Sequence, residues 1–163
     1  MRLQNFTALV SVVVCTCALN SNAAVIWDET TNGDLSGNRL VPTALRLSLG
    51  HNDVFGSVQG SELDYFTITL PPQTQLQQLV LQSYASTGQR AFIGIQQGST
   101  FTEPPPGTNV ANLHGWTHFG PRAGNVGTDI LDNIGVGAGA QGFVPPISPG
   151  PYKLWVQLDL EAE

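Results

Sequence analysis

The sequence predicts an all-β domain built as an antiparallel β-sandwich with long Gly/Pro-rich loops. Apolar and polar residues alternate in five segments, which is the period of a half-buried strand. These segments recur at intervals of about 8–12 residues with turn signals between them, a spacing typical of sandwiches. The 18 glycines and 11 prolines among 163 residues are enough to keep strands short, but too few for a disordered chain.

Residues 1–23 have the features of a secretory signal peptide. Arg2 gives a basic start, residues 6–19 form an apolar stretch, and Ser21-Asn-Ala23 supplies small residues for cleavage. The stretch is shorter than the roughly 20 apolar residues that a membrane anchor needs. We therefore expect a domain over residues 24–163 with no membrane span. It is expected to be secreted or on the cell surface, with the periplasm as an alternative.

Cysteine and charge content narrow the classes of function. Both cysteines, Cys15 and Cys17, lie in the predicted leader, so the processed chain is expected to lack disulfides and thiolate chemistry. Secretion without disulfides favours a bacterial source. Of six basic residues, Arg2 is lost with the leader, so five face 12 acids and the net charge becomes −7. This balance argues against nucleic acid as a partner and leaves divalent cations open.

The strands expected in the first half of the domain begin with residues 43–49, where Leu45, Leu47 and Leu49 share the inward side. Residues 50–53 are expected to turn into a short strand over 54–58. The clearest alternation follows at 64–70. There Asp64 has the same parity as the apolar side chains, although an unpaired buried carboxylate is costly.

Three further strands are expected before the chain ends. Their inward residues are Leu79, Leu81 and Ser83 in one, Ala91, Ile93 and Ile95 in the next, and Tyr152, Leu154, Val156, Leu158 and Leu160 in the last. Between them, residues 103–151 are rich in Gly and Pro and predict extended loops packed over one end of the sandwich. A short helix is expected at 128–134, with Thr128 as its N-cap and Gly135 at its end.

Several short motifs stand in the same order as in one known family. They are Trp27-Asp-Glu, Gly33-Asp-Leu-Ser-Gly-Asn38, Phe55-Gly-Ser-Val58, Glu62-Leu-Asp-Tyr-Phe66 and Gly150-Pro-Tyr-Lys-Leu-Trp-Val-Gln157. The chain resembles bacterial pre-peptidase C-terminal (PPC-like) domains of secreted surface proteins, although the sorting tail of such proteins is not found after Trp155. The resemblance implies a jelly-roll-like β-sandwich that is non-catalytic and acts in binding or structure outside the cell. Its partners would be an extracellular protein or a polysaccharide.

The resemblance also implies calcium, which related collagen-binding domains hold between an acidic N-terminal segment and an Asp at a strand start. The matching residues are Asp28, Glu29, Asn32, Asp34, Glu62 and Asp64. Calcium prefers six to eight oxygen ligands and tolerates irregular geometry. The alternative is that Asp34 and Asp64 cap turns through nearby backbone N–H groups.

Trp155 lies on the opposite parity from the apolar side of the last strand. If exposed, it could stack on a sugar ring together with Trp116, which makes a small carbohydrate-binding module the alternative function. The competing interpretation is that the long loops cover Trp155.

Catalytic motifs are not evident. His114 and His118 have the i, i+4 spacing of some zinc sites, but Gly115 and Thr117 disfavour a helix and no third ligand is evident. Neither a Gly-x-Ser-x-Gly elbow nor a Ser-x-x-Lys motif occurs. We therefore expect a protein that is not an enzyme.

Overall fold

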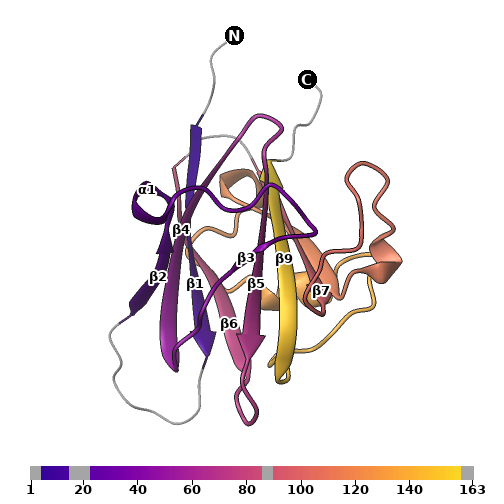
Figure 1. Cartoon of the computed structure of the whole chain (residues 1–163). Coiled ribbons are helices and arrows are strands. Elements are labelled where there is room, and N and C mark those ends of the chain that lie inside the picture. Colours follow the sequence, from indigo (N-terminus) through magenta and orange to yellow (C-terminus); the bar gives the residue numbers. More distant parts are fainter. Residues whose placement is uncertain (1–4, 15–22, 86–89, 159–163) are drawn as a thin grey trace.

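The computed structural model describes residues 5–14, 23–85 and 90–158. Strands dominate these residues and form two sheets (Figure 1). The four-stranded sheet has the order β2 (Ala24–Asp28), β4 (Gly50–Gln59), β1 (Asn5–Val14), β6 (Leu76–Tyr84). The five-stranded sheet has the order β3 (Thr43–Ala44), β5 (Leu63–Leu70), β9 (Gly150–Leu158), β7 (Ala91–Gln97), β8 (Gly115–Phe119). The helical elements are α1 (Glu29–Asn32), η1 (Val110–Asn112), η2 (Pro121–Ala123) and α2 (Leu131–Gly135).

The strand-rich class expected from the sequence is confirmed, but purely antiparallel pairing is wrong. β2 pairs parallel to β4, and β3 pairs parallel to β5. A parallel pair needs a crossover connection rather than a tight turn. The 21 residues between Asp28 and Gly50, which contain α1 and β3, supply the crossover from β2 to β4.

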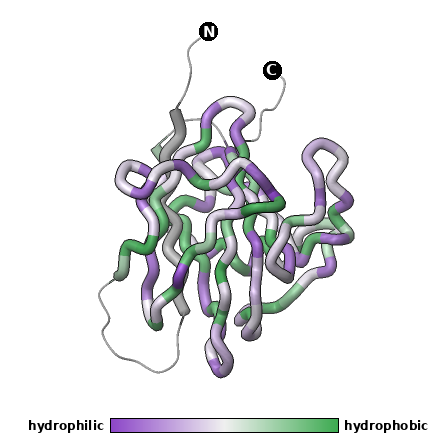
Figure 2. The backbone as a smooth tube through the Cα atoms, in the orientation of Figure 1, coloured by the Kyte–Doolittle hydropathy of each residue, from purple (hydrophilic) through white to green (hydrophobic). Residues whose placement is uncertain are grey.

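One apolar core takes residues from both sheets. Val54 and Val58 come from β4 and Leu79 from β6, while Ile68 and Leu154 come from the five-stranded sheet. Each is at most 5% exposed. Burying one such side chain contributes roughly 1.5–3 kcal/mol. The expected inward parity of β5, β6, β7 and β9 is therefore confirmed for most positions, and Figure 2 shows apolar stretches along the strands.

A second apolar cluster covers the other side of the five-stranded sheet. Tyr65 and Trp155, from β5 and β9, pack against Phe101 and Leu113, which lie between β7 and β8. The same side buries Lys153, which is 3% exposed and whose Nζ donates a hydrogen bond to the carbonyl of Thr100. Residues 103–151 are expected over one end of the sandwich, but Leu113 from this range lies on the outer face of the five-stranded sheet.

The expected strand over 43–49 is shorter than predicted. Only Thr43–Ala44 is strand, and Leu49 is 59% exposed. The expected turn at 50–53 is wrong, because β4 already begins at Gly50. The turn lies just before it and is closed by the buried side chain of Asn52. Its Oδ1 accepts from the Ser48 N–H at 2.8 Å, and its Nδ2 donates to the Ser48 carbonyl at 2.9 Å.

The helix expected at 128–134 begins later, at Leu131, and Thr128 is not its cap. The preceding residues pair with β6 instead: the Leu81 N–H donates to the Thr128 carbonyl, and the Ile130 N–H to the Leu79 carbonyl. Asp129 Oδ1 accepts from both Leu79 and Leu131 N–H groups at 3.0 Å. Tertiary pairing thus outweighs the local capping signal.

Part of the predicted leader belongs to the sheet, since residues 5–14 form β1. Residues 1–4 and 15–22, which include both cysteines, and Leu160 lie outside the described residues. Cleavage after Ala23 stays a prediction. None of the helices in the described part of the chain has the length and apolar character needed to cross a bilayer.

Candidate functional site: an acidic cluster at the start of β5

Asp64 is a buried carboxylate at the second residue of β5. It is 2% exposed, and its Oδ1 has no hydrogen-bond partner. The following residues of the same parity, Phe66 and Ile68, lie in the main core. A carboxylate oxygen in such a place needs a proton or a cation, because an unpaired buried charge is costly.

Glu29 enters the same region from α1. Its Oε2 accepts hydrogen bonds from the Ser57 N–H at 2.6 Å and the Ser57 hydroxyl at 3.0 Å, and its Oε1 accepts from the Leu35 N–H at 3.2 Å. Gly56 lies beneath it, where an added Cβ would be 3.5 Å from Oε1. These donors from β4 and from the segment after α1 fix the carboxylate in one orientation.

Asp34 reaches the cluster through the segment that follows α1. The Tyr65 N–H donates to the Ser36 carbonyl at 2.9 Å, which holds this segment alongside the start of β5. Glu29, Asp34 and Asp64 thereby each place a carboxylate oxygen within 4.8 Å of the others. Residues from three separate elements of the chain therefore converge on one point.

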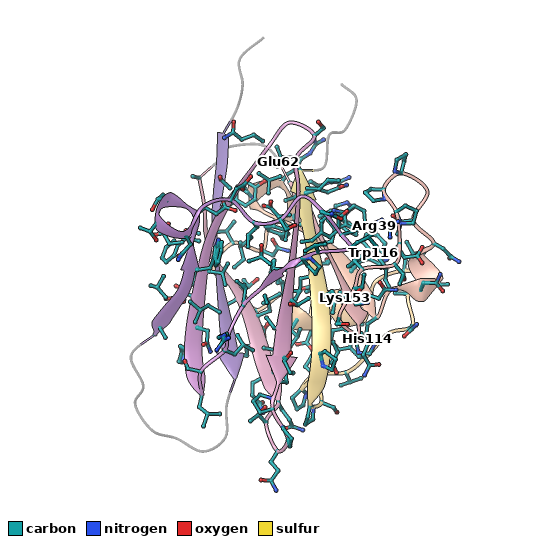
Figure 3. The ribbon with its side chains drawn as sticks, viewed as in Figure 1. Arg39, Glu62, His114, Trp116 and Lys153 are labelled. Carbon is teal, nitrogen blue, oxygen red and sulfur yellow. The ribbon has the colours of Figure 1, made fainter. Side chains whose placement is uncertain are left out.

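Glu62 lies next to this group, at the end of the sheets where β5 begins (Figure 3). Its Oε2 accepts from the Gln59 N–H at 2.9 Å. Burial and the neighbouring Asp34 raise the pKa of Glu62. The cluster therefore contains four acids, three of which form its centre.

The electrostatics of the cluster favour neutralisation. Burial raises the pKa of Asp64 to about 8, helped by the negative charges of Glu29, Asp34 and Glu62. Burial also raises the pKa of Glu29, with Asp34 adding to the effect and hydrogen bonds from Ser57 and Leu35 opposing it. The charged groups that shift the pKa of Asp64 are all acids, so they repel rather than stabilise its charge.

Two residues of the expected ligand set make local hydrogen bonds at α1. Asp28 is the N-cap of α1, where its Oδ1 accepts from the Thr30 N–H at 2.9 Å and the Thr30 hydroxyl at 2.7 Å. Asn32 Oδ1 accepts from the Asp28 N–H at 3.0 Å. The structure thus brings Glu29, Asp34, Glu62 and Asp64 together and gives Asp28 and Asn32 a capping role.

The central three acids lie within metal-ligand distance of one another. Calcium–oxygen distances are roughly 2.3–2.6 Å, so two oxygens on the same ion are at most about 5 Å apart. The three carboxylates meet that limit. Their combined charge exceeds that of one divalent ion, and the remaining ligand positions would fall to carbonyl groups or water.

Sequence reasoning did not single out Ser57, although it fixes Glu29 through two hydrogen bonds. The signal was present in the Phe55-Gly-Ser-Val58 motif. That motif combines a glycine, which leaves room for the Glu29 side chain, with a hydroxyl donor beside it.

Trp155 and Trp116 differ in how far they are buried. Trp155 is 4% exposed and packs against Phe92 at a ring-centroid distance of 4.8 Å, so loops cover it and its face is not open to a sugar. Trp116 is half-buried, and its Nε1 donates to the Ala138 carbonyl at 3.1 Å. It stacks on Phe92 at 5.8 Å and lies edge-on to His118 at 5.5 Å.

The histidine pair has packing contacts. His114 stacks on Phe143 with ring centroids 4.7 Å apart, and burial lowers its pKa. Over residues 23–85 and 90–158, neither His114 nor His118 belongs to a group of three metal-ligating side chains.

Searches of family models, curated proteins and solved structures find no match to this chain.

Proposed function

We propose that this chain is a secreted, non-catalytic binding or structural module of the bacterial cell exterior, stabilised by calcium at the acidic cluster. The jelly-roll-like PPC class is part of the proposal and is based on the ordered motifs from Trp27 to Gln157. One observation carries the calcium assignment: Asp64 is buried and has a carboxylate oxygen without a hydrogen-bond partner, and its carboxylate lies within 4.8 Å of those of Glu29 and Asp34.

A structural role for the ion follows from where its ligands originate. Glu29 is fixed to β4 by Ser57, Asp34 belongs to the segment after α1, and Asp64 starts β5. β4 and β5 lie in different sheets. An ion at this point would connect both sheets and the first crossover, and it would offset the mutual repulsion of the acids.

The test is calcium titration of the purified protein. A ligand that binds the folded state alone raises its stability, by about 2.7 kcal/mol at a free concentration 100 times the Kd. We expect calcium to raise the melting temperature of the chelator-treated protein more than magnesium does, and isothermal titration calorimetry to report one site. Asp132→Asn, an exposed acid in α2, should respond like the wild type, whereas Asp64→Asn should not respond. Equal responses of the two variants would refute the site.

A second candidate function, sugar binding, is favoured by the rings of Phe92, Trp116 and His118. They lie together on the side of the five-stranded sheet that faces away from the main core, and Trp116 retains partial exposure. The test is a polysaccharide pull-down in which Trp116→Ala loses retention and Trp155→Phe keeps it. Equal retention by Trp116→Ala and wild type would reject this function.

A further inference from the structure

β1 occupies an interior position in the four-stranded sheet. It pairs antiparallel with β4 from Asn5 opposite Gln59 to Val14 opposite Gly50. On its other edge it pairs antiparallel with β6 from Ala8 opposite Tyr84 to Val14 opposite Leu76. Figure 1 shows β1 lying alongside β4 within this layer. Both neighbours therefore satisfy one ladder of backbone hydrogen bonds through β1.

The same residues belong to the segment that the sequence predicts is removed on secretion. Without β1, the facing edges of β4 and β6 would be separated by about 9.6 Å, twice the strand spacing of about 4.8 Å. Both edges would present unpaired N–H and C=O groups. They also border the core through Val54 and Val58 of β4 and Leu79 and Leu81 of β6.

No other described strand is free to fill this gap. Across residues 23–85 and 90–158, every named strand already belongs to one of the two sheets. A second processed copy of the chain would have lost the same segment. These observations on the described residues favour a strand from a different polypeptide as the occupant.

We propose that the slot between β4 and β6 is a strand-binding site. After leader removal it accepts an uncharged strand of about ten residues, rich in β-branched side chains, from another secreted protein. The strand runs antiparallel to both neighbours, as β1 does. The expected length and composition of the strand are those of the segment that now fills the slot, Asn5-Phe-Thr-Ala-Leu-Val-Ser-Val-Val-Val14. Strand addition of this kind derives affinity from backbone hydrogen bonds and specificity from alternate side chains. The proposal depends on the secretion step of the proposed function.

The experiment starts from the full chain, with a protease recognition sequence inserted within residues 15–22, between β1 and β2. The folded protein is cut, and a fluorescent peptide with the sequence of residues 5–14 and a solubilising lysine tail is added. We expect the cut segment to stay associated during gel filtration and the labelled peptide to exchange into its place with a rise in anisotropy.

Two variant peptides test whether binding uses the ladder. Ser11→Pro removes one backbone N–H from an interior position, whereas Ser11→Thr keeps it. We expect the proline peptide to bind at least about tenfold more weakly, because one ladder hydrogen bond is lost, and the threonine peptide to bind like the parent. Equal binding by both variants would show non-specific apolar association and overturn the proposal. A cut protein that releases the segment, stays folded and takes up no peptide would overturn it as well.

Failure here is distinguishable from failure of the proposed function. An intact mass showing that the exported protein retains residues 1–23 would overturn both the secretion step and this proposal. A cut protein that binds calcium, releases residues 5–14 and takes up no peptide would overturn this proposal alone.

Discussion

Replacing Asp64 by asparagine should stabilise the calcium-free protein at neutral pH and abolish its response to calcium. The asparagine keeps the shape of the buried side chain and removes its titratable carboxyl group. In the wild type, burial and the surrounding acids make the folded protein hold a proton on Asp64 that the unfolded chain releases at neutral pH. The substitution therefore removes a destabilising group in the absence of the ion and a ligand in its presence.

The magnitude follows from the pKa of Asp64, about 8 in the folded protein against 3.8 in its ordinary state. Because the folded-state pKa is raised, the folded state holds the proton over the window from about 4 to 8 in which the unfolded chain has released it. Stability therefore falls as the pH rises through this window. A pH of 7 lies about three units above the unfolded-state pKa of 3.8. Each unit corresponds to roughly 1.4 kcal/mol, so keeping Asp64 protonated in the folded state costs about 4 kcal/mol at this pH. This value is an upper limit, since the neighbouring acids share the proton uptake.

Thermal unfolding followed by circular dichroism from pH 4.5 to 8, with chelator present, measures this effect. About 4 kcal/mol corresponds to roughly 10 °C for a domain of this size. We expect the melting temperature of the wild type and of Asp132→Asn to fall by up to that amount, and that of Asp64→Asn to change much less. Calcium should restore the wild type above pH 7 and leave Asp64→Asn unchanged. Parallel pH profiles for wild type and Asp64→Asn would refute the reasoning.

Three further substitutions test the packing of the fold at other positions. Trp155→Ala should cost about 3–5 kcal/mol in urea unfolding because it empties the centre of the second cluster; a loss under 1 kcal/mol would contradict its burial. Asn52→Ala should cost about 1–3 kcal/mol, since it leaves the Ser48 N–H and the carbonyls of Ser48 and Gly50 without their partner; unchanged stability in the same assay would argue against the turn described here. Gly115→Ala should cost about 1–3 kcal/mol, because a Cβ there would collide with the Ile134 carbonyl. Gly37→Ala, where the added Cβ would make an ordinary 3.6 Å contact, should stay near wild type, and equal losses for the two glycine variants would count against the β8–α2 contact.

Period-two alternation predicted the inward side of the core strands, because one residue of shift would move every side chain to the other face. It failed on the opposite face of β5 and β9. Tyr65, Lys153 and Trp155 have the parity of solvent-facing residues and are all buried. The residues that cover them, including Phe101 and Leu113, are distant in sequence and lie where Gly and Pro obscure any period.

The candidate site was predicted in part for the same reason. Asp64 could be found from its parity within β5, and the ordered motifs supplied Glu29 and Asp34. Sequence alone could not separate these from Asp28 and Asn32, because all carry oxygen ligands within one short stretch. The distinction depends on tertiary contacts: Ser57 from β4 holds Glu29 towards Asp64, while Asp28 is used by the Thr30 N–H.

The charge of Asp64 can be neutralised by a proton or by a cation, and the two cannot occupy its carboxylate together. A proton on Asp64 satisfies the isolated carboxylate but removes a ligand, whereas calcium requires the ionised form. With a pKa of about 8 in the absence of an ion, Asp64 is mainly protonated at pH 7, so binding of calcium must release close to one proton there and almost none at pH 9. Calorimetric titrations in two buffers of different ionisation enthalpy count that proton directly. A proton count that stays near zero at pH 7 would mean that calcium, where it binds, does not use Asp64.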